Sequence, residues 1–125
     1  MGKATILVIE DNQLNMKLVR DVLEHAGYDV VGAATGEEGV ELALGARPDL
    51  VLMDLQLPGI DGTEALRRIQ QSAPDPVMPV VAVTASAMPS DREAAAQAGF
   101  DGFLEKPLNV RALPALVASF LAWST

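Results

Sequence analysis

Runs of apolar residues predict the strands of this chain. Three of them, residues 6–9, 50–53 and 80–83, lack polar alternation, which indicates strands buried on both faces, as in a parallel sheet covered by helices. Two weaker runs, residues 29–32 and 102–104, complete the set. We therefore expect five strands.

The segments between these strands carry helical patterns. In residues 14–26, apolar side chains recur at spacings of three and four, and Gly27 follows as a C-terminal stop. Ser90 is the expected N-cap of a later helix, because Glu93 three residues on completes a capping box. Strict alternation of strands and helices predicts an α/β fold, a doubly wound parallel sheet with helices on both faces. The other predicted helices are residues 37–45, 63–71, 91–98 and 110–122.

Composition narrows the classes of function. A length of 125 residues suits one domain, residues 1–125, and 17 acidic against 9 basic residues give a net charge of -8, which argues against a nucleic-acid partner. The absence of cysteine excludes disulfides and thiolate metal sites. The N-terminus does not resemble a signal peptide, and no apolar stretch reaches the roughly 18 residues of a membrane-spanning helix. We therefore expect a cytoplasmic protein with no membrane partner.

Polar side chains follow the predicted strands where they end. The first strand ends in Glu10 and Asp11, the third in Asp54, the fourth in Thr84 and the fifth in Lys106. In doubly wound sheets, ligands bind beyond the carboxyl ends of the strands. If the first strand lies beside the third, three carboxylates converge and repel one another unless a cation compensates. Ligands that are all oxygen favour a hard ion, and Mg²⁺ is the expected cofactor.

The same residues suit phosphoryl transfer. The charge of Lys106 and the hydroxyl of Thr84, together with a metal, could neutralise the oxygens of a phosphoryl group in transfer. Asp54 is then the nucleophile. Its attack on phosphorus would give an acyl phosphate, a high-energy anhydride suited to a reversible signal.

These residues, with the segment Leu-Pro-Gly-Ile-Asp-Gly at 57–62, resemble the receiver domain of two-component response regulators over essentially the whole chain. The resemblance implies a CheY-like, flavodoxin-like three-layer sandwich with strand order 2-1-3-4-5. It also implies that Asp11 and Asp54 bind Mg²⁺ through their carboxylates and that Gln56 contributes its backbone carbonyl. Glu10, where many members of the family carry Asp, would act largely through water.

The resemblance further implies the partners. A histidine kinase or histidine phosphotransfer protein would be the phosphodonor, and a downstream protein target would receive the signal, so the chain would not be a turnover enzyme. Leu14, Asn15, Leu18 and Pro107 are the candidates for contact with the kinase. Leu18 is equally compatible with a simple core position, and the sequence leaves both readings open. We expect a monomer or weak dimer.

A conformational switch is also implied by the family. When Thr84 moves toward the phosphoryl oxygens, an aromatic side chain on the fifth strand rotates inward to fill the space, and here that residue is Phe103. The family implies a cis peptide bond between Lys106 and Pro107 as well. Gln56 and Ser86 flank the expected approach of water, and we expect them to tune the lifetime of the acyl phosphate.

The sequence also has to be weighed against other functions. Residues 9–18 are similar to single-domain cell-cycle regulators of this family and also to receivers within hybrid histidine kinases. A flavin electron carrier shares the expected architecture, but the chain has no Ser/Thr/Gly-rich phosphate loop after the first strand. A haloacid-dehalogenase-like phosphatase would need a second acid two residues after its nucleophile, where Gln56 stands.

Overall fold

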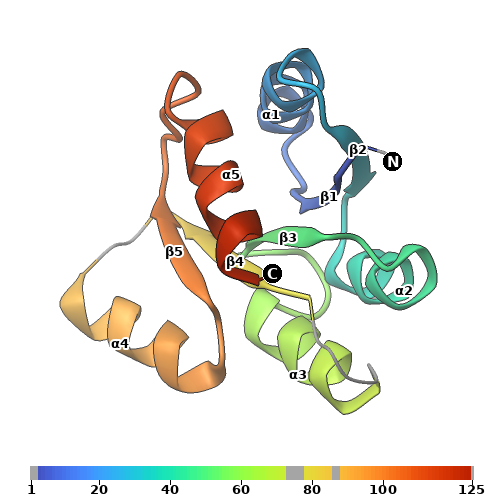
Figure 1. The fold of residues 1–125 in the computed structure, drawn as a ribbon. Coiled ribbons are helices and arrows are strands. Elements are labelled where there is room, and N and C mark those ends of the chain that lie inside the picture. The colour runs from blue at the N-terminus through green and yellow to red at the C-terminus, as the bar shows by residue number, and fades with distance from the viewer. Residues whose placement is uncertain (1–2, 73–77, 86–87, 125) are drawn as a thin grey trace.

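The strands form one parallel sheet. The computed structural model describes residues 3–72, 78–85 and 88–124, and within them five strands pair in the order β2-β1-β3-β4-β5 (Figure 1). The sheet and its strand order agree with the prediction. The strands are β1 (Thr5–Ile9), β2 (Asp29–Ala33), β3 (Leu50–Asp54), β4 (Val80–Thr84) and β5 (Gly102–Glu105).

Helices cover both faces of this sheet. In the described part of the chain each strand is followed by a helix, and α1 and α5 lie on one face while α2, α3 and α4 lie on the other (Figure 1). The bounds differ from the predicted ones by a few residues at most. They are α1 (Gln13–His25), α2 (Gly36–Ala46), α3 (Gly62–Ser72), α4 (Pro89–Ala98) and α5 (Leu113–Ser124).

The core has two halves because successive strand residues point to opposite faces. Ile6 and Val8 of β1 pack with Leu23 of α1, whereas Leu7 and Ile9 pack on the opposite face, in the cluster that includes residues of α2, α3 and α4. Burying each large aliphatic side chain contributes about 1.5–3 kcal/mol. The rigid sheet therefore fixes the strand ends at which the polar residues lie.

The predicted cap of α4 was wrong. The helix begins at Pro89, its N-cap residue is Met88, and no side chain caps it. Proline at the first helical position has the required φ angle and no N–H group that needs a partner. Ser90 consequently lies inside the first turn instead of in front of it.

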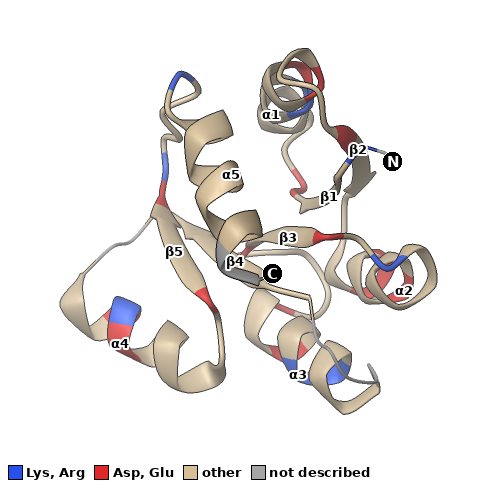
Figure 2. Ribbon diagram, viewed as in Figure 1, with Lys and Arg blue, Asp and Glu red and all other residues tan. Residues whose placement is uncertain are grey.

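Charged residues are distributed over several elements. Figure 2 shows Lys and Arg on α1, α3 and α4 and in connecting loops, interspersed with acidic residues. Among the residues described, no helix has the length and apolar character needed to cross a membrane.

Candidate functional site: an acidic pocket at the strand ends

The strand order brings three carboxylates together. β1 pairs with β3, with Ile9 opposite Met53, so the residues that come next in the two strands are neighbours. One oxygen from each of Glu10, Asp11 and Asp54 lies within 4.8 Å of the others. Glu10 and Asp54 are buried, with 7% and 5% of their surface exposed, while Asp11 is exposed at the rim.

Lys106 compensates the buried negative charge. Its Nζ lies 2.7 Å from Oδ2 of Asp54 and 2.8 Å from Oε1 of Glu10. The backbone holds this residue in place, because its N–H donates to the carbonyl of Thr84 at 2.7 Å. The peptide bond between Lys106 and Pro107 is cis, as expected.

Backbone N–H groups hold both buried carboxylates from the other side. The N–H of Gln56 donates to Oδ1 of Asp54 at 3.0 Å, and the N–H of Asn12 donates to Oε2 of Glu10 at 3.0 Å. Each donor lies two residues after its acceptor, a local pattern typical of acidic side chains in turns. The family resemblance implied that Gln56 offers its backbone carbonyl to the metal. It did not indicate that the Gln56 N–H donates to Asp54. Both carboxylates are thus oriented before any ligand binds.

The close packing of charges shifts the pKa values of Glu10 and Lys106. Burial raises the pKa of Glu10, and the nearby charge of Asp54 adds to this increase, whereas hydrogen bonds from Lys106 and from Asn12 N–H oppose it. Burial by itself would lower the pKa of Lys106. Its hydrogen bonds to Asp54 and Glu10 outweigh that effect and raise the pKa.

Replacing Glu10 by Gln should stabilise the metal-free protein at neutral pH, because burial disfavours the charged carboxylate. A raised pKa in the folded state means that Glu10 favours folding below its ordinary value of 4.5 and that this contribution is lost as pH rises through the folded pKa. Urea unfolding with a chelator should therefore show the largest advantage of Glu10→Gln at pH 7 and almost none near pH 4. If the wild type were as stable as the variant at pH 7, the prediction would be wrong. Glu41→Gln, at an exposed position of α2, serves as the control.

The donor set fits a hard divalent cation. The three converging carboxylates offer oxygen only, and the exposed position of Asp11 leaves an entrance to the cluster. Mg²⁺ prefers such ligands and usually keeps several waters. Glu10, Asp11 and Asp54, with the carbonyl of Gln56, are the residues that could hold it.

Thr84 and Phe103 lie on the same face of the sheet. Ala82 is the register partner of Phe103, both belong to the core on the α4 face, and Thr84 comes two residues after Ala82. Thr84 is buried, whereas Phe103 is only partly buried. The guanidinium of Arg92 on α4 lies 5.2 Å from the centroid of the Phe103 ring, a cation–π contact that sequence patterns did not indicate.

The residues expected to meet a kinase lie beside the acidic pocket. Asn15, Leu18 and Pro107 line a pocket of about 330 Å³ together with Lys106. Leu18 is 47% exposed while the adjacent Val19 is buried, so the core reading of Leu18 is wrong. Leu14 is 67% exposed on the same helix. Ser86, expected near the path of water, falls outside the described residues.

Comparison with known proteins decides the family. Residues 6–118 match the response regulator receiver domain. The chain belongs to this family of two-component signalling proteins. This receiver is 39% identical over 117 residues to the polar-differentiation response regulator DivK of Brucella anthropi, a match that covers 94% of this chain and 95% of that protein. DivK of Brucella ovis is 38% identical over 117 residues, again 94% of this chain and 95% of that protein.

Solved receivers have the same fold. A CheY-like receiver domain protein from Methanospirillum hungatei superposes with a TM-score of 0.89 at 29% identity, covering 98% of this chain and 97% of that one. The receiver domain of a sensor histidine kinase from Pseudomonas aeruginosa PAO1 superposes with a TM-score of 0.87 at 34% identity, covering 97% and 99%. That domain has a magnesium ion coordinated in its active-site cleft. The predicted family and fold are both confirmed.

Proposed function

We propose that this receiver takes a phosphoryl group onto Asp54 from a histidine kinase or a histidine phosphotransfer protein, and then signals through contacts with another protein. The observation that carries the proposal is the environment of Asp54. Its buried carboxylate is held by Lys106 and by the N–H of Gln56, next to two further carboxylates. This arrangement collects positive charge and ligand oxygens around a single buried carboxylate, as an acceptor of a phosphoryl group needs.

These positions support a direct transfer of the phosphoryl group to Asp54. A carboxylate oxygen of Asp54 attacks phosphorus, the bond from phosphorus to the histidine nitrogen of the donor breaks, and the nitrogen keeps the electron pair. Lys106, already 2.7 Å from Asp54, can turn its remaining donors toward the phosphoryl oxygens. The hydroxyl of Thr84, at the end of the adjacent strand β4, would donate to another. The phosphorylated chain is the product, so the protein is a stoichiometric acceptor and not a turnover enzyme.

Mg²⁺ is the proposed cofactor. Held by Glu10, Asp11 and Asp54 with the Gln56 carbonyl, it would supply positive charge for the phosphoryl oxygens. The magnesium in the related Pseudomonas receiver and the acidic cluster of this chain support the assignment.

Intact mass measurement tests the proposal. Purified protein incubated with Mg²⁺ and acetyl phosphate should gain the mass of one phosphoryl group, and a chelator should prevent the gain. A chain that stays unmodified with Mg²⁺ present, under conditions in which a known receiver is phosphorylated, would refute the proposal.

A second candidate function differs in the step after phosphorylation. The likeness to a receiver of a sensor histidine kinase favours a receiver that passes its phosphoryl group on within a hybrid kinase relay. The likeness to DivK favours a regulator that acts on a separate target. Loss of the phosphoryl group to an added histidine phosphotransfer protein, faster than hydrolysis, would support the relay.

The pocket beside the site suits a helical partner. Leu18 supplies apolar surface on α1 and Pro107 supplies it from the loop after β5, beside Glu10 and Lys106 of the acidic site. We expect Leu18→Asp to slow phosphotransfer from a phosphorylated kinase about tenfold or more while leaving uptake from acetyl phosphate unchanged, because only the protein donor needs this surface. Leu116→Asp, at an exposed leucine of α5 that does not line the pocket, is the matched control. Equal slowing by both variants would contradict the assignment.

Phe103 is the proposed relay from Thr84 to α4 and β5. Its partial exposure and the small partner Ala82 leave it able to turn toward Thr84 after phosphorylation. Phe103→Ala should leave the phosphorylation rate within about twofold of wild type, but abolish most of the change in hydrogen exchange that phosphorylation causes in α4 and β5. A full change in exchange in the variant would exclude Phe103 as the relay.

A further inference from the structure

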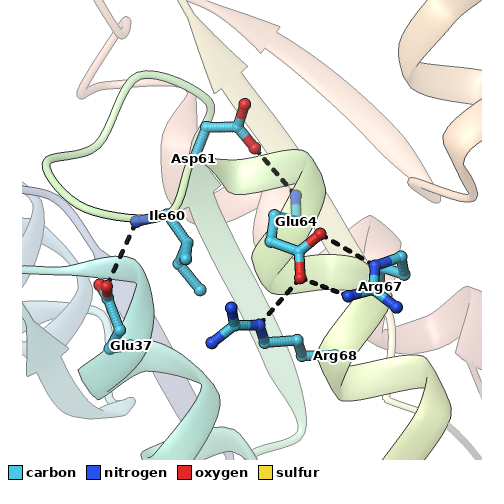
Figure 3. Close-up of polar contacts among 6 residues, drawn as sticks. All are labelled: Glu37, Ile60, Asp61, Glu64, Arg67 and Arg68. Carbon is cyan, nitrogen blue, oxygen red and sulfur yellow. Dashed lines mark hydrogen bonds and ion pairs between the residues drawn. The ribbon is translucent and has the colours of Figure 1, made fainter.

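The loop between β3 and α3, residues 55–61, determines the environment of Asp54 because it contains the Gln56 N–H donor. Its ends are fixed by the chain around it. The N–H of Leu55 donates to the carbonyl of Val83 at 3.0 Å, and the N–H of Gly62 donates to the carbonyl of Leu55 at 3.0 Å. Asp61 caps α3 by accepting from the N–H of Glu64 at 2.9 Å (Figure 3).

The tip of the loop rests on a different element, the N-terminus of α2. The N–H of Ile60 donates to Oε2 of Glu37 at 3.3 Å (Figure 3). Gly59 has a φ of +77°, and a Cβ atom there would stand 2.6 Å from both carboxylate oxygens of Glu37. A Cβ atom on Gly36 would likewise stand 2.6 Å from the carbonyl oxygen of Ile60. Glycine at both positions lets the carboxylate and the loop backbone approach this closely.

Two adjacent glutamates of α2 have different partners. Glu38 belongs to the cap of its own helix, because its N–H donates to the hydroxyl of Thr35 and its carboxylate accepts from the N–H of Ala34. Glu37 takes no part in this cap, and none of the ion pairs among the described residues involves it. Its contact with the loop is therefore not a by-product of helix capping or of a salt bridge.

We infer that Glu37 is a positioning residue for phosphorylation, which holds the tip of the loop 55–61 so that the Gln56 N–H stays directed at Asp54. The inference rests on the proposed function. Glu37 does not touch the phosphoryl group, and it acts through Ile60 and the loop. Small displacements of groups around a reacting atom slow reactions strongly, so a contact at the loop tip can influence the rate.

Variants at one position separate contact from charge. Glu37→Ala removes the acceptor, Glu37→Asp keeps the charge but is too short to reach the loop, and Glu37→Gln keeps an oxygen at the original distance without the charge. We expect Glu37→Ala and Glu37→Asp to slow phosphorylation by acetyl phosphate about three- to tenfold, and Glu37→Gln to stay within about twofold of wild type. Glu41→Ala, an exposed glutamate of the same helix, is the control and should have no effect.

A second measurement is made on metal-free, unphosphorylated protein. The amide resonances of Ile60 and Gln56 should shift and exchange faster in Glu37→Ala and Glu37→Asp, and remain near their wild-type values in Glu37→Gln. Unchanged resonances in Glu37→Ala, or unchanged phosphorylation of that variant when wild type is phosphorylated, would overturn the inference. A wild type that takes up no phosphate would instead overturn the proposed function, and the amide measurement would then decide on the loop contact by itself.

Discussion

Asp54→Asn should take up no measurable phosphate from acetyl phosphate, a loss of at least about 10³-fold in rate. The amide that replaces the carboxylate is a poor nucleophile, although it has nearly the same shape. Its oxygen can still accept from the Gln56 N–H or from Lys106, so the pocket should remain folded. Intact mass measured over several hours, alongside wild type, gives the rate.

Asp61→Asn is the matched control for this loss. Asp61 belongs to the same loop, and its side chain caps α3, a task that asparagine performs as well as aspartate. This variant should be phosphorylated like wild type. If Asp54→Asn gained phosphate as well, the acceptor would lie elsewhere in the chain, and peptide mapping would locate it.

The placement of the acidic pocket could be predicted from sequence because it depends on backbone topology. Apolar runs determined the strands, parallel strands end at one edge, and Glu10, Asp54 and Lys106 each lie at the end of a strand or directly after it. These positions do not depend on which rotamer a side chain adopts.

Contacts between side chains of different elements could not be predicted in the same way. The apolar spacing in α1 did not distinguish exposed Leu18 from buried Val19, because adjacent positions both border the apolar stripe. The contact of Glu37 with the loop after β3 joins segments 23 residues apart through an ordinary exposed glutamate. The glycines at 36 and 59 were the available signal, and glycine in turns has many other causes. No pattern in the sequence indicated the contact between Arg92 and Phe103, because it depends on how α4 packs beside β5.

Lys106→Met should both slow phosphorylation, by about 10²-fold, and destabilise the metal-free protein. The rate falls because the ammonium that stabilises charge on the phosphoryl group is lost. Stability falls because the carboxylates of Glu10 and Asp54 remain buried without their cation, and removing one partner from a fully buried ion pair costs about 3–5 kcal/mol. The Lys106 side chain is 22% exposed, so we expect a smaller loss, about 2 kcal/mol.

The pH dependence of this loss identifies its cause. The raised pKa of Lys106 means that its contribution to stability is fully present below the ordinary lysine value of 10.5 and disappears as pH rises through the folded pKa. At acidic pH Glu10, whose pKa is raised, becomes protonated and no longer needs a cation. Urea unfolding should therefore show the largest difference in the free energy of unfolding between wild type and Lys106→Met in the neutral to mildly alkaline range. The two values should converge at strongly acidic and strongly alkaline pH.

Two further conditions separate charge from shape at Lys106. Lys106→Arg should recover most of the stability, because it restores a cation, but not the full rate, because the planar guanidinium does not match the position of the ammonium. Mg²⁺ should stabilise Lys106→Met more than it stabilises wild type, since it binds the same uncompensated oxygens. A loss of stability in Lys106→Met that neither pH nor Mg²⁺ alters would mean that the lysine side chain stabilises the fold by packing, and the compensation of charge at this pocket would need another source.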